Sequence, residues 1–209
     1  HDLTSSAPRT VIGFLTYGLA ARAHGTAGPI TIISCDNLPE NGHLLRQAVL
    51  DFATAAGLEL DTYIARSVRF PATMVDRITP ATTNQMRADV ARSTGRAEAH
   101  PVMTEGFSDW VLEDNFAGPT PDWASAGAVI TQDVVPFEAR KLRLLNAAHS
   151  YLAYAGVLSG YSFVHQAVAD PKLRANVIAL FEEAARTLPA PARATADDYC
   201  HALLPPFAN

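Results

Sequence analysis

A short segment near the middle of the chain combines three side chains that can take part in acid–base and hydrogen-bonding chemistry. The segment KLRLLNAAH contains Lys141, Asn146 and His149, and Lys141 is one of only two lysines in the 209 residues. On a helix, Asn146 and His149 are three positions apart, so their side chains lie on neighbouring parts of one face. We therefore expect the amine, the amide and the imidazole to converge on one small pocket.

Projection at 100° per residue predicts which side chains of this helix face inward. The inward face holds Glu138, Lys141, Leu145, Ala148, His149 and Leu152, whereas Arg140, Arg143 and Ala147 point elsewhere. An inward lysine loses hydration of its ammonium, which favours the neutral amine and allows it to act as a general base near neutral pH. An asparagine amide can donate hydrogen bonds to a developing alkoxide without adding a charge.

Each candidate also has an ordinary structural interpretation. An isolated lysine on an amphipathic helix usually extends to solvent or pairs with a nearby acid, here Glu138, and a histidine near an apolar face is usually a core residue. Asn37 in SCDNLPENG follows an apolar run, where such residues most often cap a turn or a helix. Asp76 in MVDRITP can pair with Arg77 or cap a loop. From the residues alone, both interpretations stay open.

The first part of the chain alternates between helix and strand. Apolar spacing predicts a helix over 10–22, the β-branched run PITIISCDN predicts a strand over 29–37, and HLLRQAVLDFATAAG predicts a helix over 43–57. This order is typical of a parallel α/β sheet, in which ligands bind beyond the carboxyl ends of the strands. The polar residues that end the strand, including Asn37, are expected at that position.

The pattern changes to long helices after Pro136. Helical periodicity covers 137–160, 161–170, 171–188 and 195–204, and a Pro/Ala linker is expected over 188–196. Before Pro136, short strands are expected within 67–82, 101–116 and 126–134. The second part of the chain is therefore predicted to be mainly helical.

Composition disfavours several classes of protein. The net charge of −5, without a basic cluster, argues against nucleic-acid binding. Cys35 and Cys200 lie far apart with no CxxC spacing, so neither a disulfide framework nor a metal site is expected. No apolar run approaches the roughly 20 residues of a membrane span, and the start HDLTSS lacks the features of a signal peptide. We expect a cytoplasmic protein with no membrane, nucleic-acid or obligate protein partner.

Four stretches taken together resemble a known family of oxidoreductases. SCDNLPENG, FPATMVDRITP, EGFSDWVLEDNF and DVVPFEARKLRLLNAAHSYLAYAGVLSGY are similar to segments of the long-chain mannitol dehydrogenase family, and the resemblance runs over nearly the whole chain. It implies an α/β remnant of a Rossmann-type cofactor domain, its C-terminal part, over residues 1–66. The N-terminal part of a mainly α-helical substrate domain then covers 67–209.

The resemblance also implies roles for the candidate residues. Lys141 matches the family's general base, which removes the hydroxyl proton in polyol oxidation and returns it in ketone reduction. Asn37 and Asn146 match two asparagines that polarise the substrate oxygen as an oxyanion hole. His149 matches a histidine that binds and orients the substrate.

Two acidic residues and the cofactor complete this set. Asp76 and Glu138 match acidic residues that line the site and its proton route. The implied cofactor is NAD, with NADP as the alternative, and no zinc is required. The implied substrates are small: a polyol and its ketose, or, as in fructuronate reductases, a hexuronate. A non-catalytic binding module that keeps these residues is the remaining alternative.

The sequence departs from the family in one respect. Family members are longer and begin with a Gly-rich turn that holds the cofactor pyrophosphate, whereas no GxGxxG occurs here. We expect the chain to be an internal fragment, inactive alone, of a family-length protein, which we call the parent protein.

Overall fold

The computed structural model describes residues 2–3, 7–77, 79–104, 106 and 108–207. It divides the chain into two compact units, His1–Val75 with Trp110–Glu138 (unit 1) and Asp76–Asp109 with Ala139–Asn209 (unit 2). Residues 1 and 4–6 of the start HDLTSS, and residues 78, 105 and 107 of the motifs, lie outside the described residues. The domain boundary expected after residue 66 stays a prediction.

Unit 1 begins with the predicted helix, α1 (Val11–Ala23). Thr10 caps it, because its Oγ1 accepts the Gly13 N–H at 3.1 Å. The Thr10 N–H and hydroxyl in turn donate to the Asp2 carboxylate at 2.8 and 2.7 Å. The helix packs with α2 (Asn41–Ala55), and Leu19 and Val49 lie in their shared core.

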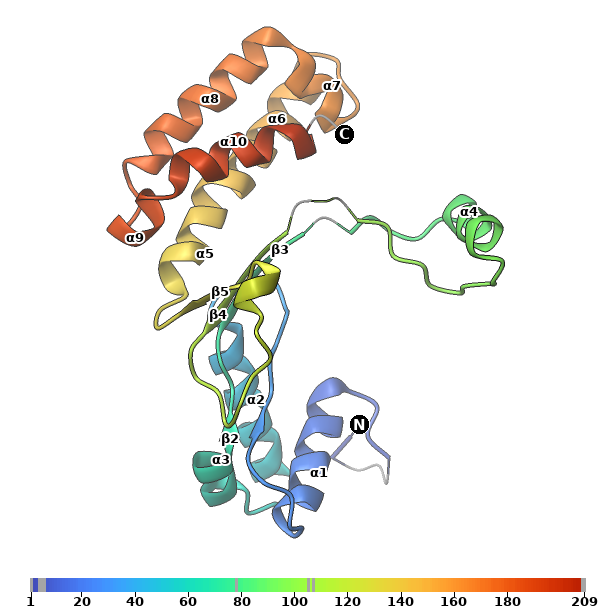
Figure 1. The fold of residues 1–209 in the computed structure, drawn as a ribbon, viewed down its shortest axis with the longest axis vertical. Coiled ribbons are helices and arrows are strands. Elements are labelled where there is room, and N and C mark those ends of the chain that lie inside the picture. The colour runs from blue at the N-terminus through green and yellow to red at the C-terminus, as the bar shows by residue number, and fades with distance from the viewer. Residues whose placement is uncertain (1, 4–6, 78, 105, 107, 208–209) are drawn as a thin grey trace. The chain divides into compact units, whose positions relative to one another are not determined.

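Unit 1 also contains a two-stranded parallel sheet, whose residues Ile30 and Val68 pack in the same core as these helices (Figure 1). Strand β1 (Ile30–Thr31) pairs with β2 (Val68–Arg69), which follows α3 (Asp61–Ser67). The strand expected over 29–37 is therefore much shorter than predicted. Its paired part ends just after Thr31, and the polar residues beyond it form an irregular loop.

A second sheet has the order β3-β4-β5. It consists of β3 (Thr73–Asp76), β4 (Asp109–Glu113) and β5 (Val129–Thr131), and β4 and β5 run parallel. The turn η1 (Ala124–Ala126) lies between β4 and β5. A small core forms from Ala72, Met74, Val111 and Val134. These strands lie within the segments where the sequence predicts strands.

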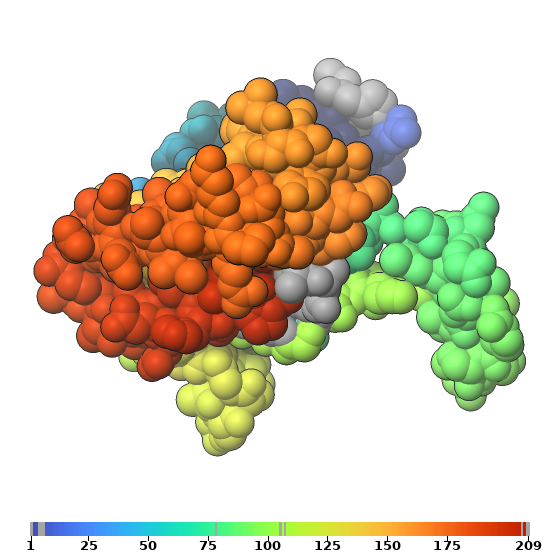
Figure 2. All heavy atoms as spheres, turned by 90° about the horizontal axis from the view of Figure 1, so that it is seen from above, coloured from blue at the N-terminus to red at the C-terminus, as the bar shows by residue number. Residues whose placement is uncertain are grey.

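Unit 2 is mainly helical, as predicted. Its elements are α4 (Asn84–Thr94), the end of α5 (Val135–Lys141), the π-helical turn η2 (Leu142–Asn146), α6 (Ala147–Leu158), α7 (Val164–Ala169), α8 (Pro171–Ala185), α9 (Ala190–Arg193) and α10 (Ala196–Phe207). The core includes Leu144, Leu152, Val177 and Leu203. Figure 2 shows α8 and α10, in orange and red, packed side by side. Among the described residues, none of the helices has the length and apolarity that crossing a membrane requires.

The Pro/Ala stretch over 188–196 is not the linker that its composition predicts. It contains α9, and Leu188 and Ala192 are 1% and 0% exposed. Proline is tolerated in the first turn of a helix because the N–H groups there have no partner within the helix. The prolines therefore begin a helix, and Leu188 before it and Ala192 within it belong to the core of unit 2.

Candidate functional site

Lys141, Asn146 and His149 lie around the π-helical turn η2. A π turn contains more residues than an α turn, because its hydrogen bonds run from i to i+5. Projection at a constant 100° per residue is therefore wrong over this segment. Arg140, predicted to point outward, is 6% exposed, and Leu144 is fully buried. His149, predicted to face inward, is exposed.

The burial of Lys141 is confirmed. The residue is only 9% exposed, although it lies at the end of α5 in a segment with exposed Leu142 and Arg143 next to it. Burial removes part of the water that would otherwise solvate an ammonium. The side chain is therefore turned away from bulk solvent, as the sequence predicts.

Asn146 and His149 share an open depression in the surface of unit 2. Ser150, Ala153 and Tyr154 line it with them. The His149 ring also contacts the Phe207 ring edge-on, with their centroids 6.0 Å apart. The amide and the imidazole therefore lie together as predicted, whereas Lys141 is not among the residues that line this depression.

A buried charged cluster precedes the π turn. The guanidinium of Arg140 forms an ion pair with Asp109, and both side chains are largely buried. It also donates to Thr195 Oγ1 at 2.8 Å and lies 4.3 Å from the centre of the Tyr199 ring. These contacts fix the residue directly before Lys141 against the start of α10.

Asp76 joins the same cluster from β3. Its side chain is 6% exposed, and the Tyr199 hydroxyl donates to Asp76 Oδ2 at 3.1 Å. Burial, followed by the nearby Asp76 charge, raises the pKa of Tyr199 far above its ordinary range, so the phenol acts as a neutral donor. The sequence does not reveal this role of Arg140 and Tyr199, because Arg140 lies 31 residues from Asp109 and Tyr199 lies 123 residues from Asp76, which leaves no local pattern.

Asn37 lies on an exposed bend of unit 1, beyond the carboxyl end of β1. Helix α2 begins at Asn41, and the N-cap of this helix is Glu40 rather than Asn37. The helix-cap alternative for Asn37 is therefore wrong. Glu40 has the left-handed backbone conformation, with φ 49° and ψ 38°, which turns the chain sharply into the helix.

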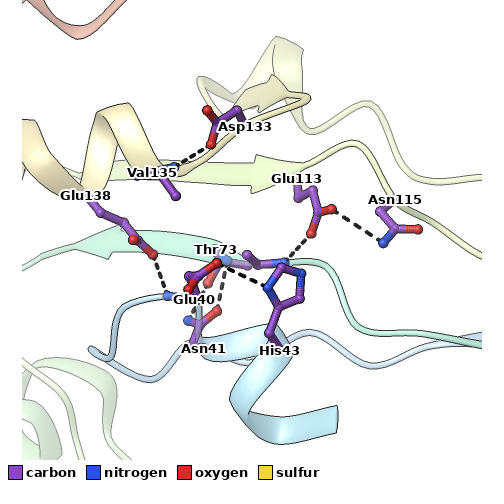
Figure 3. Close-up of polar contacts among 10 residues, drawn as sticks. Glu40, Asn41, His43, Thr73, Glu113, Asn115, Asp133, Val135 and Glu138 are labelled. Atoms are coloured by element: carbon purple, nitrogen blue, oxygen red, sulfur yellow. Dashed lines mark hydrogen bonds and ion pairs between the residues drawn. The ribbon is translucent and has the colours of Figure 1, made fainter. Parts of the chain in front are cut away.

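Glu138 holds the other end of this loop. Its Oε1 accepts the Glu40 N–H at 2.9 Å, as Figure 3 shows. Burial raises the pKa of Glu138, and the negative charges of Glu40 and Asp133 act in the same direction, whereas the Glu40 N–H bond lowers it. The structure thus places Glu138 beside the Asn37 loop, within unit 1.

The described residues contain no cluster of three or more His, Cys, Asp or Glu side chains able to hold a metal ion. Both cysteines are free thiols. Partial burial raises the pKa of Cys200 to about 11, so its reactive thiolate form is scarce near neutral pH.

Comparison with known proteins gives matches over nearly the whole of this chain. Residues 4–125 match the mannitol dehydrogenase Rossmann domain, and residues 133–209 match the mannitol dehydrogenase C-terminal domain. A D-mannonate oxidoreductase of Escherichia coli is 41% identical over the whole chain, which covers 43% of that protein. A mannitol 2-dehydrogenase of Phaeosphaeria nodorum is 40% identical over 97% of the chain, which covers 36% of that protein.

Solved structures agree with these matches. A D-sorbitol dehydrogenase in substrate-free form superposes with a TM-score of 0.89 at 35% identity. A Pseudomonas fluorescens mannitol 2-dehydrogenase, solved in a ternary complex with NAD and D-mannitol, superposes with a TM-score of 0.82 at 40% identity. Each comparison covers 100% of this chain and 43% of the other, so the chain spans less than half the length of these relatives.

These matches confirm the predicted family and fold class. The Rossmann-domain match covers more than half of the chain, and the relatives align with nearly all of it. The chain belongs to the mannitol dehydrogenase family, with part of a Rossmann-type domain followed by part of the family's C-terminal domain.

Proposed function

We propose that the parent protein is an NAD-dependent oxidoreductase that interconverts a sugar alcohol and its ketose by reversible hydride transfer. The observation that carries this proposal is the burial of Lys141, which directly precedes a π turn that leads to an amide and an imidazole in one open depression. Mannitol 2-dehydrogenases among the relatives at 40% identity support the same class of reaction.

In this proposal Lys141 is the general base. Its neutral amine takes the proton from the substrate hydroxyl during oxidation, and its ammonium returns the proton during reduction. A lysine is suited to this step because an amine can accept and return a proton, whereas an arginine in a protein stays protonated. The proton is accepted by an amine, so the proposed reaction needs no zinc ion.

Asn37 and Asn146 are proposed to stabilise the charge that develops on the substrate oxygen. Their amides donate hydrogen bonds to an alkoxide, and each such donor typically contributes 10²–10³ in kcat. His149 is proposed to orient the substrate from the rim of the depression that it shares with Asn146. Asp76 and Glu138 are proposed as acidic residues of the site and its proton route.

The residues of this chain do not fit the pyrophosphate of NAD. The sequence has no Gly-rich turn of the kind that cradles a dinucleotide. The N-terminus of α2, which follows β1, is closed, because Glu40 N–H already donates to Glu138 and the Phe70 and Pro71 carbonyls lie against Gly42. The proposal therefore assigns only the proton and substrate chemistry to this chain.

A hexuronate is the alternative substrate. The specific observation in its favour is the D-mannonate oxidoreductase of Escherichia coli, which aligns with the whole chain at 41% identity. A carboxylate on the substrate would then replace the terminal hydroxymethyl group of a ketose, while the roles of the base and the amides stay the same.

Oxidation of NADH by the parent protein with fructose or fructuronate tests these proposals. Faster turnover of fructose supports the polyol reaction, and faster turnover of fructuronate supports the hexuronate alternative. Absence of turnover with both would contradict both enzyme proposals and favour a binding module. The same assay with NADPH decides the cofactor preference.

A further inference from the structure

A single buried amide organises the loop that carries Asn37. Asn41, the first residue of α2, is only 2% exposed. Its Nδ2 lies 3.3 Å from the Ser34 carbonyl oxygen, 2.9 Å from the Asp36 carbonyl oxygen and 2.9 Å from Thr73 Oγ1. Its Oδ1 accepts the Thr73 N–H at 2.9 Å. Figure 3 shows Asn41 and Thr73 facing each other, with hydrogen bonds between them.

Thr73 completes this network from β3. Its hydroxyl donates to the Ser34 carbonyl oxygen at 2.6 Å, while it accepts a hydrogen bond from the Asn41 amide. The Ser34 carbonyl is thus held by the Thr73 hydroxyl, 39 residues along the chain, whereas the two N–H groups of the Asn41 amide make their shorter bonds to Asp36 and Thr73. Two side chains therefore hold the backbone of the segment that precedes Asn37.

The loop receives little support from strand pairing. Paired backbone ends just after Thr31, and the loop from Ser34 to Glu40 is exposed along most of its length. Its far end is held by the Glu40 N–H bond to Glu138. Between these ends, the Asp36 carbonyl accepts from the Asn41 amide and the Asp36 N–H donates to Ser34 Oγ, both directly before Asn37 in the sequence.

The chemistry of this position requires an amide. The Asp36 carbonyl oxygen and Thr73 Oγ1 take a donor from this side chain, and the Thr73 N–H takes an acceptor from it. An asparagine side chain supplies both, whereas an aspartate would place its negative charge against the carbonyl oxygens. An apolar residue would leave the buried polar groups without partners.

We propose that Asn41 is a positioning residue, which acts on the reaction by holding the backbone of the loop so that the Asn37 amide is aimed at the substrate oxygen. The proposal rests on the proposed function, because it takes the role of Asn37 from there. Misplacement of a catalytic group by about 1 Å can cost 10²-fold in rate. Loss of the Asn41 amide is therefore expected to lower kcat without removing any group that touches the substrate.

A double-mutant cycle in the parent protein tests this coupling. Asn41→Ala is expected to lower kcat by about 10- to 100-fold with a smaller change in KM, because a misplaced donor weakens the transition state more than substrate binding. In an Asn37→Ala background the same substitution is expected to change kcat by less than about twofold, because the donor that it positions is already gone. Asn84→Ala, at the exposed first residue of α4, is the matched control with unchanged kcat.

The outcomes separate this proposal from the proposed function. An equal loss of kcat from Asn41→Ala in both backgrounds, or no loss in the wild-type background, would overturn the positioning role alone. An unchanged kcat in Asn37→Ala would overturn both the oxyanion role of Asn37 and the positioning role. If Asn41→Ala does not fold, Thr73→Val carries the same cycle, because it removes the hydroxyl that donates to Ser34 and keeps the side-chain shape.

Discussion

The two regions that carry the proposed oxyanion donors hold their residues by different means. Asn37 lies on an exposed bend of unit 1, whose backbone is tied down by the side chains of Asn41, Thr73 and Glu138. Asn146 ends a π turn of unit 2, which is fixed by the fully buried Leu144 and Ala148 and preceded by the Arg140 ion pair. One region depends on hydrogen bonds to loop carbonyls, and the other depends on burial.

This difference determines how each region should respond to substitution. A hydrogen-bonded loop can shift while the rest of its unit stays folded, so damage there is expected mainly in kcat. A helix packed through buried side chains and a buried ion pair is expected to lose stability before it loses geometry.

Removal of the Arg140 guanidinium is expected to have the largest effect on stability. Arg140→Met leaves the largely buried Asp109 carboxylate without this cation, and breaking a buried ion pair typically costs about 3–5 kcal/mol. Urea unfolding monitored by circular dichroism measures this loss. Arg92→Met is the matched control, because its ion pair with Asp89 is exposed and should contribute less than about 1 kcal/mol. Similar losses in both variants would show that the burial of the Arg140 pair is not what stabilises unit 2.

A methyl group at Gly42, at the start of α2, is expected to lower stability less than the loss of the Arg140 guanidinium does. The added Cβ would lie 2.5 Å from the Phe70 carbonyl oxygen and close to Pro71, so the backbone has to shift. We expect Gly42→Ala to lower the free energy of unfolding by about 1–3 kcal/mol. Gly18→Ala in α1 has open space around its Cβ and should instead stabilise the helix by about 0.5–1 kcal/mol. Equal effects of the same sign would contradict the close packing at the start of α2.

The start of α2 illustrates what the sequence could and could not predict. The helices α1, α2 and α8 follow from apolar spacing, because each pattern is local and uninterrupted. The PENG segment indicates a turn, but nothing in it shows that the Asn41 amide is buried against Thr73, because that contact joins residues 32 positions apart.

Only some features of the candidate site could be predicted from the sequence. The burial of Lys141 and the nearness of Asn146 to His149 follow from helical spacing. The exposure of His149 does not, because the π turn changes the angular step before it. The burial of Arg140 does not either, because its partners Asp109 and Tyr199 are distant in the sequence.

The smallest expected effect is the pH dependence of stability at Glu138. Its pKa is raised in the folded state, so its contribution to stability is fully present below about pH 4.5 and falls as the pH rises through the folded value. Glu138→Gln keeps an oxygen that can accept the Glu40 N–H and has no such titration. We therefore expect the glutamine variant to gain stability relative to wild type between about pH 4.5 and 7, as thermal melting across this range would show. A relative loss over that interval would contradict the raised pKa.

The kinetics of Lys141→Ala in the parent protein test the central claim most directly. If Lys141 is the general base, kcat should fall by about 10²- to 10⁴-fold, the melting temperature should change little, and added methylamine should restore part of the activity. Lys172→Ala, at the only other lysine and exposed on α8, should leave kcat unchanged. Near-normal kcat in Lys141→Ala, with a lowered melting temperature and no response to methylamine, would show that Lys141 has only a structural role.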